Sequence, residues 1–292
     1  MHHLVILLRC LKELLVKHRN SIFRKKRMSS LRYLLTVVIL ISLVSCGFNS
    51  SFYHPDETEV KTPVSAESQY VHYESDSVHV LHYLPESPKA SILMLHGNAG
   101  NLSGWSEVAD LFYLAGYEVY ILDYPGFGNS SGKPKHQAVY AATDAVAHHF
   151  NQSAQHDKRL LMGFSLGGNL AVKVATDHPD YFNAMALEGA FDNHVNAARQ
   201  SIPRPFRFLA NLFVKNHIKG EELIQQWNKP LLVIHSKDDR TCPYEMGVSL
   251  HQNAASKNKS LWSIEGPHLS GISKYFETYM LKIENLIDNN QD

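Results

Sequence analysis

Short apolar runs alternate along the chain with longer segments in which apolar residues recur at the spacing of a helix. Five of these runs are nearly continuous, which is typical of parallel strands buried on both faces of a sheet. The runs are Ser91–Leu95, Tyr117–Leu122, Arg159–Met162, Ala184–Leu187 and Pro230–Ile234. The helical segments are Trp105–Ala115, Gln137–Phe150, Leu166–His178 and Ile272–Ile287. This alternation predicts right-handed crossover units and an open, mostly parallel sheet.

Three more strands are predicted outside this series. Gln69–Glu74 and Val78–Tyr83 alternate residue types with period two around a short Ser/Asp turn, which predicts an antiparallel hairpin. Leu261–Ile264 is a last strand, directly before the final helical segment. The stretch Phe191–Trp227 has room for only one or two short helices, so we expect a small apolar cap and a fairly open cleft.

Length and composition indicate a globular protein. The 292 residues allow one large domain or two small ones, and 44% hydrophobic with 19% charged residues excludes collagen, coiled coil and wholesale disorder. Residues 1–45 hold nine of the 28 Lys and Arg but a single acidic residue, Glu13. The rest therefore carries 19 basic and 27 acidic side chains, which argues against a nucleic-acid partner for the folded part.

The basic N-terminal segment contains an uncharged, mostly apolar run, Tyr33–Val44. Its 12 residues are too few for a membrane span of about 20 but suit the core of a secretory signal, and Arg24–Arg27 precede it. The residues that follow, Leu43–Cys46, resemble the bacterial lipobox, in which the cysteine is acylated and becomes the new N-terminus. A short uncleaved anchor with an incidental cysteine is the alternative.

These features predict a protein held in the bacterial cell envelope by lipid on Cys46. Residues 1–45 would be an N-terminal extension and lipoprotein signal peptide, and translation from Met28 instead of Met1 would give that signal its usual length. Residues 46–67, rich in Ser, Thr, Pro and acidic residues, are predicted to be a solvated tether. Residues 68–292 are predicted to be the folded domain.

Neither a metal nor a nucleotide is expected. The three cysteines have no zinc-ligand spacing, and the adjacent His148 and His149 would point in different directions from a helix. The glycines Gly126, Gly128 and Gly132 form neither a dinucleotide fingerprint nor a phosphate loop. The sequence thus predicts no cofactor.

A candidate nucleophile lies in Gly163–Gly167, which reads Gly-Phe-Ser-Leu-Gly between an apolar strand and a helical segment. This Gly-x-Ser-x-Gly pattern is typical of a tight, strained turn that exposes the serine hydroxyl, because only glycine lets the flanking backbone pack so closely. Ser165 is therefore the predicted nucleophile.

A serine nucleophile needs an imidazole to take its proton and a carboxylate to orient that imidazole. His268 follows the last strand and precedes the final helix, as the base should, whereas His235 ends a strand and is expected to make turn hydrogen bonds. Asp238 and Asp239 both follow a late strand and compete for the third role. Asp123, beside a Pro-Gly turn, is expected to hold loop hydrogen bonds.

The oxyanion of the intermediate needs two preorganised N–H donors. One should come from the residue after the nucleophile, Leu166, and the other from the loop after the first parallel strand, at Asn98. Both would act through backbone amides, so we expect substitution of either side chain to do less than substitution of Ser165.

Three blocks of sequence together resemble the α/β-hydrolase superfamily. They are Leu-His-Gly-Asn-Ala-Gly-Asn from Leu95, Asp-Tyr-Pro-Gly-Phe-Gly-Asn-Ser-Ser-Gly from Asp123, and Gly-Phe-Ser-Leu-Gly-Gly from Gly163. The resemblance runs from Ser91 to the C-terminus and is closest to the prolyl-oligopeptidase-related branch of small, often membrane-anchored serine hydrolases. It implies an α/β-hydrolase fold, with a mostly parallel central sheet, helices on both faces and a small cap.

The resemblance also favours Asp239 as the triad acid, since related hydrolases carry Asp three residues before a Val-Pro pair. Here the pair is Cys242-Pro243, and Ser236 also replaces the usual glycine. Cys242 is interpreted as a small packing residue.

The predicted activity is cleavage of carboxylic esters through an acyl-enzyme on Ser165, with a small-molecule or lipid ester as substrate. Cleavage of thioesters, lysophospholipids or peptides would use the same groups. An alternative of another class is a noncatalytic, lipid-anchored envelope binding protein that keeps the fold.

Overall fold

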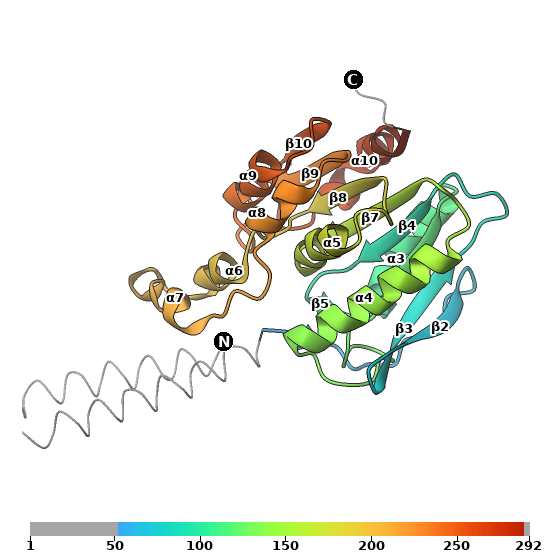
Figure 1. Cartoon of the computed structure of the whole chain (residues 1–292), viewed down its shortest axis with the longest axis horizontal. Helices are drawn as coiled ribbons and strands as arrows, with labels where there is room; N and C mark the ends of the chain where they lie inside the picture. The colour runs from blue at the N-terminus through green and yellow to red at the C-terminus, as the bar shows by residue number, and fades with distance from the viewer. Residues whose placement is uncertain (1–51, 289–292) are drawn as a thin grey trace, which may run out of the picture.

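The computed structural model describes residues 52–288 (Figure 1). The predicted signal segment 1–45 and the lipidation residue Cys46 lie outside the described residues. None of the helices within 52–288 is both long and apolar enough to cross a membrane.

An eight-stranded sheet forms the centre of the domain, with the spatial order β10-β9-β8-β7-β4-β6-β3-β2. The strands are β2 Glu67–Tyr73, β3 Asp76–Tyr83, β4 Ser91–Leu95, β6 Glu118–Leu122, β7 Arg159–Phe164, β8 Ala184–Glu188, β9 Leu231–Ser236 and β10 Lys259–Ile264. Strands β2 and β3 form the predicted antiparallel hairpin, and β3 pairs antiparallel with β6. All other pairs are parallel, which confirms the predicted sheet.

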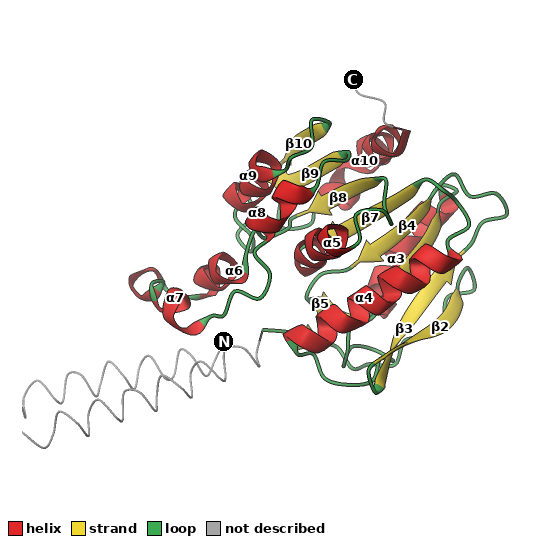
Figure 2. Cartoon of the chain, viewed as in Figure 1, coloured by secondary structure: helices red, strands yellow, loops and turns green. Residues whose placement is uncertain are grey.

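Helices cover both faces of the sheet (Figure 2). The long ones are α3 Leu102–Leu114, α4 His136–Ser153, α5 Leu166–Asp177, α9 Tyr244–Asn253 and α10 Gly271–Asp288. Helix α9 is absent from the sequence prediction, because only Met246, Gly247 and Leu250 of its ten residues are buried and its apolar stripe is short.

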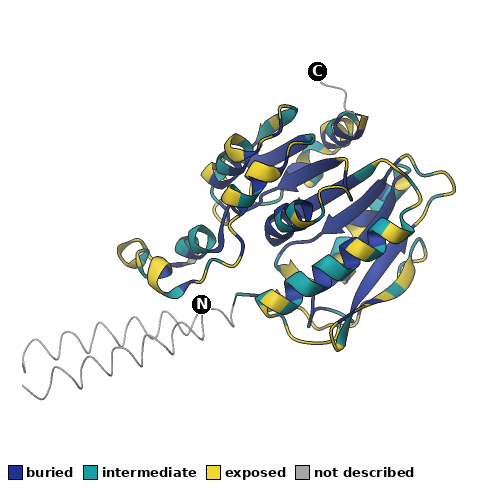
Figure 3. Cartoon of the chain, in the orientation of Figure 1, coloured by how far each residue is buried: buried dark blue, intermediate teal, exposed yellow. Residues whose placement is uncertain are grey.

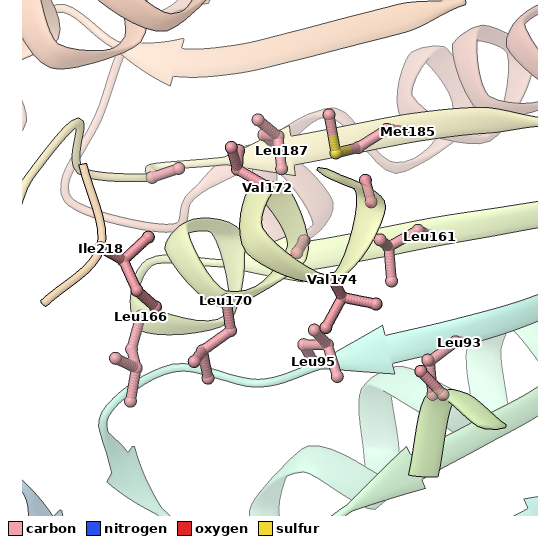
Figure 4. Packing of buried hydrophobic residues seen from close by; sticks show 14 of the residues in the cluster. Leu93, Leu95, Leu161, Leu166, Leu170, Val172, Val174, Met185, Leu187 and Ile218 are labelled. Carbon is pink, nitrogen blue, oxygen red and sulfur yellow. The ribbon is translucent and has the colours of Figure 1, made fainter. Parts of the chain in front are cut away.

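Successive strand residues point to opposite faces, so the continuous apolar runs build two cores. In β4, Leu93 and Leu95 pack with α4, α5 and α9, whereas Ile92 and Met94 pack with α3 and α10. Figure 4 shows the first core, with Leu161 of β7 close to the α5 residues. The inner strands β4, β6 and β8 are accordingly buried along their whole length, whereas the edge strands β2 and β10 are partly exposed (Figure 3).

The described part of the predicted tether packs on the domain instead of lying free in solvent. Tyr53 and Val60 are only 5% and 4% exposed, and Asn129 hydrogen-bonds both the N–H and the C=O of Val60. Strand β1 (His54–Pro55) pairs with β5 (Ala99–Gly100) in a separate two-stranded sheet. The few apolar residues here show no periodicity, so their sequence alone does not reveal this packing.

The cap between β8 and β9 contains three short α-helices and two 3-10 turns, more elements than predicted. They are α6 His194–Ser201, η1 Arg204–Phe206, α7 Leu209–Phe213, α8 Gly220–Leu223 and η2 Ile224–Gln226. Helices α6 and α7 project from the edge of the domain around a small core of their own, which includes Ala198 and Ala210 (Figure 1). Phe208 and Leu212 of the cap are 59% and 67% exposed, so they face away from that core.

Candidate active site

The predicted nucleophile lies in the turn from β7 into α5, at the carboxyl edge of the sheet. Ser165 has φ 53° and ψ −110°, a backbone conformation that residues other than glycine rarely adopt. Its N–H donates to the carbonyl of Glu188 at 2.9 Å, which ties the turn to the end of β8. A Cβ at Gly167 would lie 1.9 Å from the Leu95 carbonyl oxygen, so the motif needs glycine here.

The predicted base and acid are in direct contact. His268 Nδ1 donates to Asp239 Oδ2 at 2.6 Å, and Asp239 Oδ1 accepts from the backbone N–H groups of Thr241 and Cys242 at 2.8 and 2.9 Å. Burial alone would raise the pKa of the Asp239 carboxyl, but hydrogen bonds from His235 and His268 hold it well below its ordinary value. Asp239 is therefore ionised and acts as an acceptor.

The two adjacent acids point in different directions. Asp238 Oδ2 accepts from the Gly266 N–H at 3.1 Å and so holds the loop that leads to His268. His235 donates through Nε2 to the Cys242 carbonyl at 2.7 Å, the turn hydrogen bond expected of it, and the same nitrogen is 3.5 Å from Asp239 Oδ2. Asp239, and not Asp238, is thus the partner of His268.

The imidazole of His268 lies over the residue that follows Glu188. A Cβ at Gly189 would come within 2.9 Å of His268 Cε1, so only glycine leaves room for the ring. Because Glu188 also holds the Ser165 N–H, the imidazole and the serine flank one short segment of backbone. Among the described residues, however, no hydrogen bond joins Ser165 to His268; in apo enzymes this contact often tightens only with substrate.

Cys242 lies inside the site, although the sequence suggests only a packing role. Its thiol is buried, and the Ser165 side chain is close enough to influence its pKa. Burial, together with the negative charge of Asp239, raises the pKa of this thiol to about 12. The thiol is consequently protonated and is not a competing nucleophile.

Glu188 is a second residue whose role the sequence does not reveal. Its Oε1 accepts from the Gly271 N–H at 2.8 Å, at the start of α10. Burial raises the pKa of Glu188 above its ordinary value. Glu188 therefore links the end of β8 to the helix that follows His268.

The predicted oxyanion donors occupy suitable positions in the chain. Leu166 is the first residue of α5, where backbone N–H groups have no acceptor within the helix. The Asn98 side chain is engaged elsewhere, since Nδ2 donates to the Phe52 carbonyl at 2.6 Å and Oδ1 accepts from the His54 N–H at 3.3 Å. Any role of Asn98 in the reaction would accordingly fall to its backbone amide.

Asp123, at the end of β6, has a loop contact of the expected kind. Its Oδ1 accepts from the Leu102 N–H at 2.9 Å, where α3 begins, and His96 Nε2 lies 3.7 Å from the same oxygen. Burial raises the pKa of Asp123 to about 7 and lowers that of His96 to about 4.

An apolar pocket of about 510 Å³ opens between α3 and α10 on one face of the sheet. Its walls include Trp105, Val108, Phe164, Leu269 and Phe276. Phe164 precedes Ser165 and Leu269 follows His268 in the chain, so the pocket borders the site. At the Gly97 Cα, a Cβ would contact Trp105, Leu269 and Ser165 together, which brings the pocket wall close to the serine.

Comparisons with known proteins agree with this architecture. A family model described as the alpha/beta hydrolase fold matches residues 90–219. The uncharacterized protein YfhR of Salmonella typhi is 25% identical over 288 residues, which cover 90% of this chain and 96% of that protein. An uncharacterized membrane protein of Saccharomyces cerevisiae is 30% identical over 185 residues, which cover 61% of this chain and 63% of that protein.

Among solved structures, the Pyrococcus furiosus esterase Pf2001 superposes with a TM-score of 0.67 at 16% identity, covering 82% of this chain and 97% of that one. At 16% identity, this structural similarity is evidence for the fold alone. Together with the family match it shows that the chain has the α/β-hydrolase fold, which confirms the fold class predicted from the sequence.

Proposed function

We propose that the protein is a serine hydrolase that cleaves carboxylic esters through an acyl-enzyme on Ser165. The observation that carries this proposal is the hydrogen bond of 2.6 Å between His268 and Asp239, beside a serine held at φ 53°. Backbone strain of this kind costs about 1–3 kcal/mol and persists where the surrounding structure requires it, often at active sites.

The imidazole is oriented for proton transfer. Because Nδ1–H donates to Asp239, the neutral ring carries its lone pair on Nε2, the atom that would accept the serine proton. Ser165 Oγ would then attack the ester carbonyl, and His268 would return the proton to the leaving alcohol. Water activated by the same imidazole would release the acid and restore the serine.

Three groups would balance the charges that form in this cycle. Asp239 is ionised and would stabilise the imidazolium formed during attack. The amides of Leu166 and Asn98 would donate to the oxyanion, and loss of one such donor typically costs about 2.7–4 kcal/mol.

The pocket between α3 and α10 favours an ester with an apolar acyl group. Its aromatic and aliphatic walls would exclude water from an acyl chain, and Ser165 lies at its border. Thioesters, lysophospholipids and peptides remain alternatives because they pass through the same tetrahedral chemistry. The pocket supports the acyl esters among these over a peptide, whose polar backbone would find few partners there.

Hydrolysis of p-nitrophenyl esters of increasing chain length tests this assignment. We expect turnover that is lost in Ser165→Ala and a preference for medium-chain over acetyl esters. Val108→Trp, which fills the pocket, should lower activity on the octanoate at least tenfold while sparing the acetate. Leu114→Trp is the matched control on the same helix, since Leu114 is 78% exposed and is not part of the pocket wall.

A noncatalytic binding protein would give a different result in that assay. The folded protein would show no turnover of any ester in the series, and Ser165→Ala would be indistinguishable from the wild type. Retention of the acetate and octanoate activities in Ser165→Ala would equally contradict the proposal, because it would require another nucleophile.

We also propose that Cys46 carries the lipid that holds the enzyme in the bacterial cell envelope. The lipobox-like Leu43–Cys46 after an apolar run supports this location. Labelled palmitate should enter the wild-type protein but not Cys46→Ala, and equal labelling of both would contradict it. Several acyl chains together anchor a protein durably, at about 0.8 kcal/mol per buried methylene.

A further inference from the structure

A cluster of potential metal ligands lies where the end of α5 meets α4. Asp144 and His148 are one turn apart on α4, and His178 directly follows the last residue of α5. The three side chains offer one oxygen and two nitrogens, all within 4.8 Å of one another. We propose that these residues form a binding site for a divalent transition metal, with Zn²⁺ the best match.

The distances within the cluster are close to those of a tetrahedral zinc site. With bonds of about 2.0–2.1 Å, ligand atoms on tetrahedral zinc lie roughly 3.3 Å apart. His178 Nε2 lies 2.6 Å from Asp144 Oδ1, and His148 Nε2 lies 3.8 Å from Asp144 Oδ2. All three donor atoms lie within 4.8 Å of one another, so rotations of these side chains would bring them onto one ion.

The second ring nitrogen of His148 has a hydrogen-bond partner, at the position where metal-binding histidines usually have a carboxylate, a carbonyl or a water. The Tyr181 hydroxyl lies 2.6 Å from His148 Nδ1, so it can accept the Nδ1 proton and leave the lone pair of Nε2 for the metal. The Tyr181 ring also stacks on His178, with ring centroids 4.6 Å apart and planes 8° from parallel. Tyr181 thus orients both imidazoles.

The donor set and its surroundings favour a transition metal over Ca²⁺ or Mg²⁺. Two imidazoles with one carboxylate suit zinc, whereas calcium and magnesium require mostly oxygen ligands. The nearby Lys173 ammonium is paired with Asp177, which offsets its charge. The side chains of His148 and Asp144 are 49% and 31% exposed, so an ion and a water ligand can reach them.

This site is separate from the proposed catalytic centre. Ser165 precedes the first turn of α5 and His178 follows its last turn, and a helix of 12 residues spans about 18 Å. A bound ion would cross-link α4 to the end of α5 and stabilise the folded state, because it binds the assembled site more tightly than it binds the unfolded chain. Ester hydrolysis need not change.

The test is a zinc titration of the full-length, chelator-treated protein in competition with a chromophoric chelator. We expect the wild type to bind one equivalent of zinc. This binding should be lost, or its affinity lowered at least tenfold, in Asp144→Asn, His148→Gln and His178→Gln. His149→Gln is the matched control, because His149 is next in the chain but contacts Gln69. It should bind as the wild type does, and esterase activity should be unchanged in all four variants.

Two further measurements test the site without changing its three ligands, so they do not depend on whether the ligand variants fold. Tyr181→Phe keeps all three ligands and should weaken zinc binding about tenfold or more, since it removes the partner of His148. Cobalt(II) in the wild type should give the visible absorption of a tetrahedral site, and zinc should raise the melting temperature. Zinc affinity and stoichiometry in the folded ligand variants equal to those of His149→Gln would overturn the proposal, as would the absence of saturable binding.

Discussion

Two buried carboxylates at the same edge of the sheet behave in opposite ways. Asp239, beyond β9, receives two backbone N–H groups and the imidazole of His268, and its pKa is well below the ordinary value. Asp123, beyond β6, receives the Leu102 N–H at one oxygen, and no partner within 52–288 reaches Oδ2, so burial raises its pKa to about 7.

The difference shows that burial does not decide the charge of a carboxyl group by itself. Both side chains are shielded from water, but only Asp239 has enough donors to offset the lost hydration. An ionised acid beside an imidazole can stabilise a positive charge that forms during a reaction. A half-protonated acid at the start of a helix instead holds the loop by hydrogen bonds. The comparison therefore supports the proposed catalytic role of Asp239 and the structural role expected of Asp123.

Loss of the Asp239 charge should have the largest effect. Asp239→Asn keeps the shape of the side chain but favours the wrong imidazole tautomer, so we expect kcat to fall about 10⁴-fold. Asp238→Asn is the matched control, because the Asp238 carboxylate accepts from the Gly266 N–H instead of from His268, and it should lose less than about tenfold. Similar losses in the two variants, measured on one ester, would remove the distinction between these acids.

Displacement of the imidazole should have the next largest effect. Gly189→Ala would place a methyl group 2.9 Å from His268 Cε1 at a residue with φ 58°, so the ring must shift. A shift of about 1 Å in catalytic geometry can cost roughly 10²-fold in kcat. Gly104→Ala is the control, since its Cβ would meet nothing within 4 Å. Full activity in Gly189→Ala would mean that the position of His268 is unimportant.

Replacement of the Asp123 carboxyl group should have the smallest effect on activity, a few-fold at most, and a distinct effect on stability. Native Asp123 keeps its proton up to about pH 7, while the unfolded chain loses it near pH 3.8. Between these values wild-type stability falls as pH rises, by at most about 1.4 kcal/mol per pH unit from this group. In Asp123→Asn this contribution is absent.

Urea unfolding at pH 5 and pH 8 measures that effect. The free energy of unfolding of Asp123→Asn, relative to the wild type, should be higher at pH 8 than at pH 5. A difference between the two proteins that does not change with pH would show that Asp123 is already ionised in the folded state.

Much of the fold follows from the sequence, because burial on both faces leaves a strong local signal. The run Ser91–Leu95 matches β4 residue for residue, and the Gly-x-Ser-x-Gly pattern lies at the strand-to-helix turn that it requires. The contact of His268 with Asp239 agrees with the roles expected of them, although their function in catalysis stays a prediction.

What the sequence does not reveal depends on contacts between distant residues. Cys242 comes close to Ser165 only in the folded chain, and Glu188 reaches α10 across 83 residues of chain. The cluster of Asp144, His148 and His178 is hidden for the same reason, since His178 is 34 residues from Asp144 and no local spacing links them. Such sites carry no periodicity that a single sequence can display.

Covalent labelling by a fluorophosphonate tests the central claim most directly. The probe reacts only with a serine whose hydroxyl is activated, so the account predicts one adduct on the peptide that contains Ser165. Labelling should be absent in Ser165→Ala and strongly slowed in His268→Gln. An unlabelled but folded wild-type protein, or an adduct on another residue that persists in Ser165→Ala, would contradict the proposed triad.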